Sequence, residues 1–508
     1  MPGIAAGIRS IVPPRWTDRQ IVMFLFLSLW ATYTFFIPSP QMDNANQISR
    51  MALVFSIAES GSLSIEKLAD FTLDKALYGG RYYSDKAPGT SFTALPFVAA
   101  SLASFNALGL DTVPIVEGRV SRSFAKFTCV AIVFTSSLFT AAAAAMLYHL
   151  ARHWNATRNA ALFAALCFGV ATPAAGWATV FFGHALAGAC LFLAFTVISL
   201  GAALRSQAPG ENILAFVTGV LLAWAVVVEF TVAPTSFAIG AYGFFLALAK
   251  PAKRRRAVIT MALAGGVLGL LPLLTYNSVA FGSPFHVGYS SVVGFEGEGM
   301  KQGFMGVSVP RPGVLYELLF GARRGIVWIA PILLLWPIAC WACWRPLPTA
   351  AIAVLIFVPV AFLLINAGYV YWDGGWSTGP RHVTPALAFA CLPLAFLWMQ
   401  AGRAGRAAML AVAGVSGSVT LICISVDMMS PSDYANPLLE YLVPNFLAGY
   451  IHNALTMAWY VRGNEYHNAW YGLGSLAVVP TIWLVFGLLV AQWPRLTGRL
   501  SRQQLTTR

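Results

Sequence analysis

Charged residues are scarce in this chain. Asp, Glu, Lys and Arg make up only 10% of its 508 residues, against about 25% in an average soluble domain. Hydrophobic residues make up 58%, the mean hydropathy is +0.70, and long uncharged runs occur throughout. Because about 20 consecutive apolar residues can span a bilayer as a helix, this composition excludes a soluble enzyme and predicts a polytopic membrane protein.

The alternation of apolar and polar residues that marks barrel strands is also missing. Only helices and closed barrels satisfy the backbone in lipid, so the continuous apolar runs predict an all-α fold without a separate soluble domain. The seven cysteines all fall inside apolar runs, which excludes an extracellular disulfide framework. Cys340 and Cys343 form a CxxC within an apolar helix without a second pair, so we expect no metal there.

The number of spans follows from the positions of the basic residues. Thirteen apolar runs are found, near 20–38, 91–109, 124–150, 158–178, 184–204, 212–229, 231–249, 257–276, 326–344, 348–368, 384–400, 405–427 and 471–493. If all thirteen crossed the membrane from a cytoplasmic N-terminus, the basic cluster at 250–256 and the basic C-terminal tail would lie outside, against the positive-inside rule. An interfacial or re-entrant 91–109 segment leaves about 12 spans and places every short basic loop in the cytoplasm.

This topology assigns the net charge of +13 to orientation and makes a nucleic-acid partner unnecessary. Both termini are expected in the cytoplasm and the long polar loops on the outer face. Two modules are expected: 1–276, with the first outer loop 39–122, and 277–508, with outer loops 277–325, 369–383 and 428–470. Large loops rich in glycine and aromatic residues indicate binding or catalysis.

The first outer loop begins with an acid close to the membrane surface. Asp43 precedes a predicted helix over 44–59. Two interpretations are open: Asp43 is the N-cap of this helix, or, facing Gln47 and Arg50, it accepts a proton from a bound hydroxyl group.

A glycine-bounded segment, GGRYYSDKAPG at 79–89, follows in the same loop. Arg81 and Lys86 are suited to the phosphate of a lipid carrier, and Tyr83 and Asp85 are candidates for sugar or acceptor binding. The alternative is a solvated turn.

Two further candidates lie at helix ends. His184 follows the turn WATVFFG and would donate a hydrogen bond to acceptor or phosphate, unless it is a satisfied structural residue. Glu229, in AVVVEFTVAP, is an ionisable group at membrane depth. Its alternative role is an ion pair with Arg119, Arg122 or Lys126.

The loop 277–325 is too rich in glycine to be one helix, and we expect it to form a wall or lid with Tyr276, Asn277 and Tyr289 facing sugar. At its end, Arg323 and Arg324 are expected at the outer membrane boundary, although most basic residues of loops next to spans lie on the cytoplasmic side. Binding of an anionic headgroup and snorkelling to the membrane surface both account for this position.

The densest group of polar and aromatic residues is YVYWDGGWSTGPRH at 369–382. Interfacial belts explain aromatic residues alone, but not their combination with three glycines and a Gly-Pro-Arg-His segment. Arg381 at a helix start suits a phosphate. The remaining candidates, for acceptor or sugar binding, are Trp372, Asp373, Trp376 and His382.

Together, Asp43 after the first helix and Lys86-Ala87-Pro88 before a horizontal helix resemble motifs of the GT-C superfamily of polyprenyl-phosphate-sugar-dependent glycosyltransferases. The closest branch is the protein-mannosyltransferase and aminoarabinose-transferase type (glycosyltransferase family 39-like). The resemblance implies a GT-C-like fold, Asp43 as the catalytic carboxylate acting as a base, and Lys86 near the carrier phosphate. Two positions depart from the pattern: Asn44 stands where a second carboxylate is common, and Ala87 replaces a proline.

The expected function is therefore an inverting glycosyl transfer from a polyprenyl-phosphate sugar to a cell-envelope acceptor at the periplasmic face of a bacterial inner membrane. The expected partners are the lipid-linked donor and a membrane lipid or glycan acceptor. No cofactor is required by the residues, and whether a divalent cation assists is left open. A transporter or flippase of an anionic lipid or sugar conjugate is the alternative.

Overall fold

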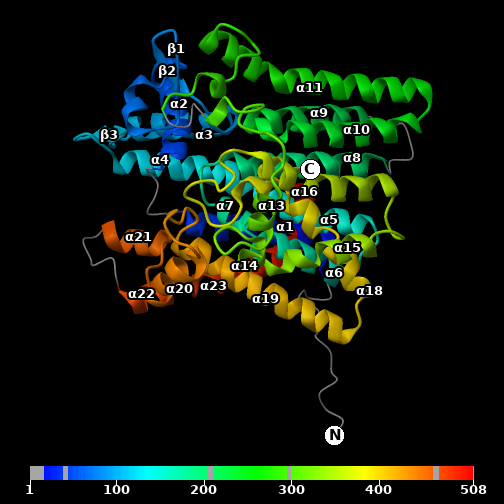
Figure 1. Ribbon diagram of the computed structural model, residues 1–508. Helices are drawn as coiled ribbons and strands as arrows, with labels where there is room; N and C mark the ends of the chain where they lie inside the picture. Colours follow the sequence, from blue (N-terminus) through cyan, green and yellow to red (C-terminus); the bar gives the residue numbers. More distant parts are fainter. Residues whose placement is uncertain (1–15, 38–43, 203–209, 295–298, 462–467, 507–508) are drawn as a thin grey trace.

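Helices form most of the protein. The computed structural model describes residues 16–37, 44–202, 210–294, 299–461 and 468–506 (Figure 1). The α-helices are α1 (Asp18–Phe36), α2 (Ala45–Ser60), α3 (Gly89–Ala107), α4 (Arg122–Ile132), α5 (Leu138–His153), α6 (Arg158–Val170), α7 (Ala174–Trp177), α8 (Gly183–Ala202), α9 (Gly210–Val228), α10 (Ala233–Leu248), α11 (Ala252–Phe281), α13 (Pro312–Leu319), α14 (Ile326–Ile329), α15 (Trp336–Ala342), α16 (Thr349–Gly368), α17 (Leu387–Cys391), α18 (Leu394–Gln400), α19 (Arg403–Val426), α20 (Val443–Leu447), α21 (Ala454–Val461), α22 (Ala469–Ser475) and α23 (Val478–Thr506).

Shorter elements connect these helices. Two antiparallel hairpins are formed by β1 (Lys75–Tyr78) with β2 (Arg81–Ser84) and by β3 (Ile115–Val116) with β4 (Arg119–Val120). Short 3-10 turns cover Glu66–Phe71, Phe230–Val232, Gly288–Ser291, Pro331–Leu335 and Arg381–Ala386, and π-helical turns cover Val133–Ser137 and Leu438–Leu442.

The helical, many-span architecture predicted from the sequence is confirmed. Within the described residues, 10 helices are long and apolar enough to cross a membrane. Two of the predicted spans are shorter here: 158–178 contains α6, and 326–344 contains the apolar stretch Pro331–Ala342. Helix α3, which covers the predicted interfacial segment, is not among the 10. The count of about 12 spans stays a prediction.

Helices α8, α9, α10 and α11 run side by side, and the β1–β2 hairpin and α2 gather at one end of this layer (Figure 1). Glycines bring α9 and α11 into close contact. A Cβ atom at Gly219 would lie 1.9 Å from the Ala262 carbonyl oxygen, and one at Gly265 would lie 2.0 Å from the Phe216 carbonyl oxygen. Small residues of this kind let membrane helices approach each other backbone to backbone.

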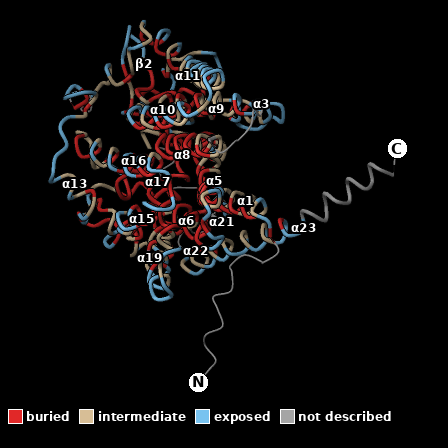
Figure 2. Tube along the Cα trace, turned by 90° about the vertical axis from the view of Figure 1, so that its right-hand side faces the viewer, coloured by how far each residue is buried: buried red, intermediate tan, exposed pale blue. Residues whose placement is uncertain are grey.

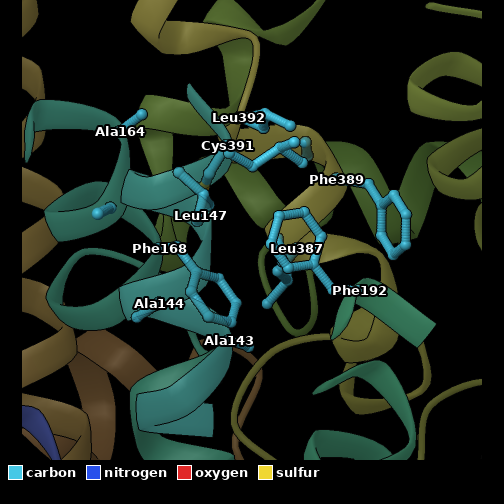
Figure 3. Packing of buried hydrophobic residues seen from close by; sticks show 14 of the residues in the cluster. Ala143, Ala144, Leu147, Ala164, Phe168, Phe192, Leu387, Phe389, Cys391 and Leu392 are labelled. Atoms are coloured by element: carbon cyan, nitrogen blue, oxygen red, sulfur yellow. The ribbon is translucent and has the colours of Figure 1, made fainter. Parts of the chain in front are cut away.

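The main core lies at the centre of the molecule. Buried residues concentrate in α5, α6, α8 and α17, whereas α11 is largely exposed (Figure 2). Alanines of α5 and α6 pack against larger side chains from α8 and α17, including Phe192 and Leu387 (Figure 3). This alternation of small and large side chains keeps the helices close.

The first long loop folds onto this layer. The predicted helix over 44–59 is α2, and its N-cap is Asn44, whose side chain accepts a hydrogen bond from the Asn46 amide. The interpretation of Asp43 as the N-cap was therefore wrong. Helix α3 packs against α2, α4 and the π-helical turn Val133–Ser137. In the last of these contacts the Phe97 ring stacks on Phe134 at 4.4 Å between centroids.

Candidate active site around Glu229

Glu229 lies at the break between two candidate spans. Helix α9 ends at Val228, and the backbone of Glu229 is extended, with φ −154° and ψ 115°. The residue is only 3% exposed. A carboxylate so deeply buried requires partners that compensate for lost water, and residues from three other segments provide them.

The first partner is Arg50 of α2, which is 2% exposed. Its Nη2 lies 3.8 Å from Glu229 Oε2. Its Nη1 donates to the Ala87 carbonyl at 3.1 Å and to Thr90 Oγ1 at 3.2 Å, and its Nε donates to Asn46 Oδ1 at 3.0 Å. Arg50 therefore joins α2, the start of α3 and the end of α9.

Two glycines allow these segments to meet. A Cβ atom at Gly183 would lie 2.8 Å from the Val228 carbonyl oxygen and 2.9 Å from Glu229 Oε2. At Gly89, the first residue of α3, a Cβ atom would lie 2.6 Å from the carbonyl carbon of Val227. Any larger residue at either position would push α8 or α3 away from Glu229.

Two histidines extend the site toward the 369–382 loop. His184 Nδ1 lies 3.5 Å from Glu229 Oε2, and the rings of His184 and His382 meet edge to face at 4.9 Å between centroids. The His382 ring also contacts Tyr369 at 5.2 Å. The buried Nε2 atom of His382 has no hydrogen-bond partner among the described residues.

Arg381 lies next to these histidines. Its guanidinium carbon is 5.2 Å from the centroid of the Phe182 ring, a cation–π distance. Its Nε atom is buried and, in the described part of the chain, makes no hydrogen bond. Arg381 Nε is thus a buried donor with capacity for an anionic ligand.

Lys86 also faces the site, but carboxylates already surround it. Its Nζ lies 2.9 Å from Asp85 Oδ2 and 3.1 Å from Asp74 Oδ2. The Tyr289 ring lies 5.9 Å from the same nitrogen. Two carboxylates reduce the net positive charge that Lys86 presents to a phosphate.

The charges around Glu229 act on its protonation. Burial raises the pKa of Glu229 above its ordinary value, and the positive charges of Arg50, Lys86 and Arg381 oppose this rise. The same three cations therefore lie close enough to act electrostatically on one carboxyl group, although the sequence places them in three distant segments.

The other predicted site residues are placed differently. Asp43 lies outside the described residues. Arg81 is exposed in the β1–β2 hairpin, and Trp376 is 47% exposed. Tyr83 is buried in an apolar cluster with its ring 5.3 Å from Phe281. The structure gives none of these three a contact with Glu229.

The two arginines at the end of the 277–325 loop are placed differently from each other. Arg324 is fully buried and donates from Nε to the Asp373 carbonyl at 2.6 Å and from Nη2 to the Gly375 carbonyl at 2.5 Å. Arg323 pairs with Asp373 Oδ2 at 3.1 Å. Snorkelling and headgroup binding were both wrong for Arg324, because its donors hold the glycine turn that precedes Arg381.

Some other expectations change as well. Glu229 pairs with Arg50, so the predicted ion pair with Arg119, Arg122 or Lys126 was wrong. Asn277 donates to the Pro284 carbonyl, and Tyr276 donates to the Ser84 carbonyl at 3.4 Å, so both support the loop. The half-buried Trp372 belongs to the same turn as Asp373.

The sequence analysis missed Arg50 and Asp74 as site residues. Arg50 is the only charged residue in the stretch 45–58, and this lone cation among apolar residues is the signal that could have identified it. Asp74 carries no such signal, because exposed acids are common in a polar loop. Within the described residues, no group of three His, Cys, Asp or Glu side chains could hold a metal ion, so no step of the chemistry is assigned to one.

Comparisons with known proteins give structural matches only. No protein-family model and no curated protein matches the sequence. The structure of ArnT from Cupriavidus metallidurans bound to undecaprenyl phosphate matches with 13% identity and a TM-score of 0.48, over 94% of this chain and 77% of that one. The oligosaccharyltransferase AglB from Archaeoglobus fulgidus, in complex with an inhibitory peptide and a dolichol-phosphate, matches with 11% identity and a TM-score of 0.47, over 80% of this chain and 55% of that one.

Proposed function

We propose that this protein is an integral-membrane glycosyltransferase. It transfers a sugar from a polyprenyl-phosphate carrier to a cell-envelope acceptor at the periplasmic face of a bacterial inner membrane, with inversion at the anomeric carbon. The observation that carries this proposal is the convergence of Arg50, Lys86, Arg381 and two histidines on the buried Glu229.

This cluster suits a phosphate leaving group. Charge-assisted hydrogen bonds from arginine to phosphate are strong and directional, and Arg381 Nε is a buried donor without a hydrogen-bond partner among the described atoms. Lys86 adds charge at longer range, since Asp74 and Asp85 already pair with it.

The reaction is a single displacement. The acceptor hydroxyl oxygen attacks the anomeric carbon, the bond from that carbon to the phosphate oxygen breaks, and the carrier phosphate leaves with the electron pair. The hydroxyl proton passes to Asp43 as general base. Arg381 stabilises the negative charge that develops on the phosphate, the kind of preorganised stabilisation on which enzymes commonly depend.

A transporter would use these charges differently. Ionisable residues on a transport path are expected near the middle of several spans. Here His184 and Arg381 lie in the first turns of candidate spans and Glu229 lies just beyond another. Charges gathered at one end of the helices favour a reaction at one membrane surface.

The test is transfer by the purified protein in lipid nanodiscs, with a panel of polyprenyl-phosphate sugars and released carrier phosphate as the readout. Asp43→Asn should lower turnover by about 100-fold or more, the usual contribution of a general base. Asp70→Asn changes an exposed acid of the same loop and should leave turnover unchanged.

Donor binding is measured separately. Arg381→Ala should weaken binding of the lipid-linked donor by about 10- to 100-fold, because it removes charge-assisted hydrogen bonds. Arg403→Ala, at an exposed arginine of α19, is the matched control. Full turnover by Asp43→Asn would remove the assigned base, and unchanged donor binding by Arg381→Ala would remove the phosphate site.

A further inference from the structure

A long apolar groove lies between α9, α10 and α11, away from the Glu229 cluster. It has a volume of about 670 Å³ and is lined mainly by carbon atoms of these helices, with α8 on one side. Its lining includes none of the residues of the Glu229 cluster, which are Arg50, Lys86, His184, Glu229, Arg381 and His382. The groove is therefore a site separate from the proposed reaction centre.

The packing of the helices explains why the groove exists. Gly219 and Gly265 join α9 to α11 by backbone contact, while α10 contacts α8 and α9 more extensively than it contacts α11. The space left between α10 and α11 is bordered by Phe237 and Phe244, whose side chains are 80% and 53% exposed. The close contact between α9 and α11 fixes one wall of the groove. The groove is open on the side of α10, where these two phenylalanines are exposed.

Charge is distributed unevenly along the groove. At one end the lining includes Glu211 and Lys250, with Lys250 Nζ 2.6 Å from Glu211 Oε1. Arg254 also pairs with Glu211, and Lys253 and Arg255 stand beside it in the first turn of α11. This end is therefore net positive.

The end nearer to Glu229 has the opposite character. It is lined by Val226 and Ser236, and neither carries a charge. A carrier lipid whose phosphate lies at Arg381 could occupy the groove only if the two sites were connected. None of the described residues of the phosphate site lines the groove, so the groove does not belong to the carrier.

We propose that the groove binds an anionic phospholipid, with its headgroup at the basic end and its acyl chains along α9. From Glu211 to Val226 the helix rises by about 22 Å at 1.5 Å per residue, which exceeds half of the roughly 30 Å hydrocarbon core and accommodates an acyl chain. Basic residues beside a span attract anionic headgroups. The bound lipid fills the space behind α9, the helix that ends one residue before Glu229.

The first experiment compares two lipids with identical acyl chains. Detergent-purified, delipidated protein is titrated with phosphatidylglycerol or phosphatidylcholine, and bound lipid is counted by native mass spectrometry alongside the thermal midpoint. Phosphatidylglycerol should be retained preferentially and should raise the midpoint. Equal retention of the two lipids would overturn the proposal.

Variants then locate the site. Lys253→Gln and Arg255→Gln should each weaken phosphatidylglycerol binding by about fivefold, the ratio that corresponds to about 1 kcal/mol per basic residue at a membrane surface. Both leave the ion pairs of Glu211 in place. Arg403→Gln removes an exposed arginine at the start of α19 and should change nothing.

A groove-filling variant tests the position of the acyl chains. A Cβ atom at Gly240 meets only Leu222 at 3.6 Å, so Gly240→Leu fits the helix but occupies the groove, and it should lower phosphatidylglycerol retention. The proposal fails if this variant and the two α11 variants retain the lipid like the parent protein. It also fails if undecaprenyl phosphate displaces phosphatidylglycerol, since the groove would then belong to the carrier.

Discussion

Buried charges define this protein at the scale of single residues. Arg50 and Glu229 are 2% and 3% exposed, and loss of one would leave the other without its charge partner in a poorly hydrated environment. Arg324 is also fully buried, but its guanidinium donates hydrogen bonds to backbone carbonyl groups and is not paired with a carboxylate among the described residues. The first pair lies at the proposed reaction centre, whereas Arg324 supports it through the turn at Gly374.

Arg323 and Arg324 provide a matched pair for a stability test. Arg324→Met should destabilise the protein by about 3 kcal/mol, because it removes hydrogen bonds from a buried charged donor to two carbonyl groups. Arg323→Met should cost about 1 kcal/mol or less, since its ion pair with Asp373 is partly exposed. The thermal midpoint in detergent measures both. Equal shifts would contradict the supporting role of Arg324.

Asp427 predicts a dependence of stability on pH. Burial raises its pKa to about 7, while hydrogen bonds from the Met429 amide and the Tyr441 hydroxyl oppose the rise. In the unfolded chain the carboxyl ionises near its ordinary value, so the folded state binds more protons between about pH 4 and 7. Stability should therefore fall as the pH rises through this range and level off above it.

The check is the thermal midpoint between pH 5 and 8. Asp427→Asn should flatten the pH dependence and raise the midpoint at pH 8, because an uncharged amide can still accept from the Met429 amide. Asp433→Asn, at an exposed acid of the same loop, should keep the slope of the parent protein. A parent midpoint that rises with pH would contradict the raised pKa.

At the scale of elements, the site depends on how closely helix ends approach each other. Helix α3 begins at Gly89 against the last turn of α9. Gly89→Ala should cost about 1–3 kcal/mol, as overpacking usually does, and should lower transferase activity by moving Lys86. Thermal midpoint and turnover are measured together.

The matched control is Gly414→Ala in α19, where an added Cβ atom would meet nothing within 4 Å. Alanine favours helix over glycine, so this variant should keep or raise the midpoint. If Gly89→Ala behaved like Gly414→Ala, the contact between α3 and α9 would not be needed to position the loop.

At the scale of the whole molecule, the distribution of charge predicts which ends of the helices face the cytoplasm. The β1–β2 hairpin belongs to the predicted outer loop, and Lys253 begins α11 at the other end of the α8–α11 layer (Figure 1). A membrane-impermeant thiol reagent on intact cells should label Gly79→Cys but not Lys253→Cys, which should react only after lysis. The parent is the control, because its seven cysteines are buried or half-buried. Labelling of both variants in intact cells would contradict the topology.

The composition and the apolar runs predicted the helical membrane architecture, because a span is a local property of about 20 residues in lipid. The apolar run 158–178 was predicted as one span, but it breaks into α6 and α7 at Pro173, which directly precedes α7 and is a local signal for such a break. The short motifs pointed to His184, Glu229, Arg381 and His382, since ionisable residues at helix ends are unusual in such a chain.

The sequence by itself determined that charge is concentrated at helix ends and loops, and which residues are candidates for chemistry. Only the tertiary structure decided their partners. Arg50 pairs with Glu229 across 179 positions because Gly89 and Gly183 allow helix ends to meet there, and Arg324 turns inward because the carbonyl groups of the 373–375 turn accept its hydrogen bonds. Pairing of buried charges is a property of three-dimensional proximity, and local sequence does not encode it.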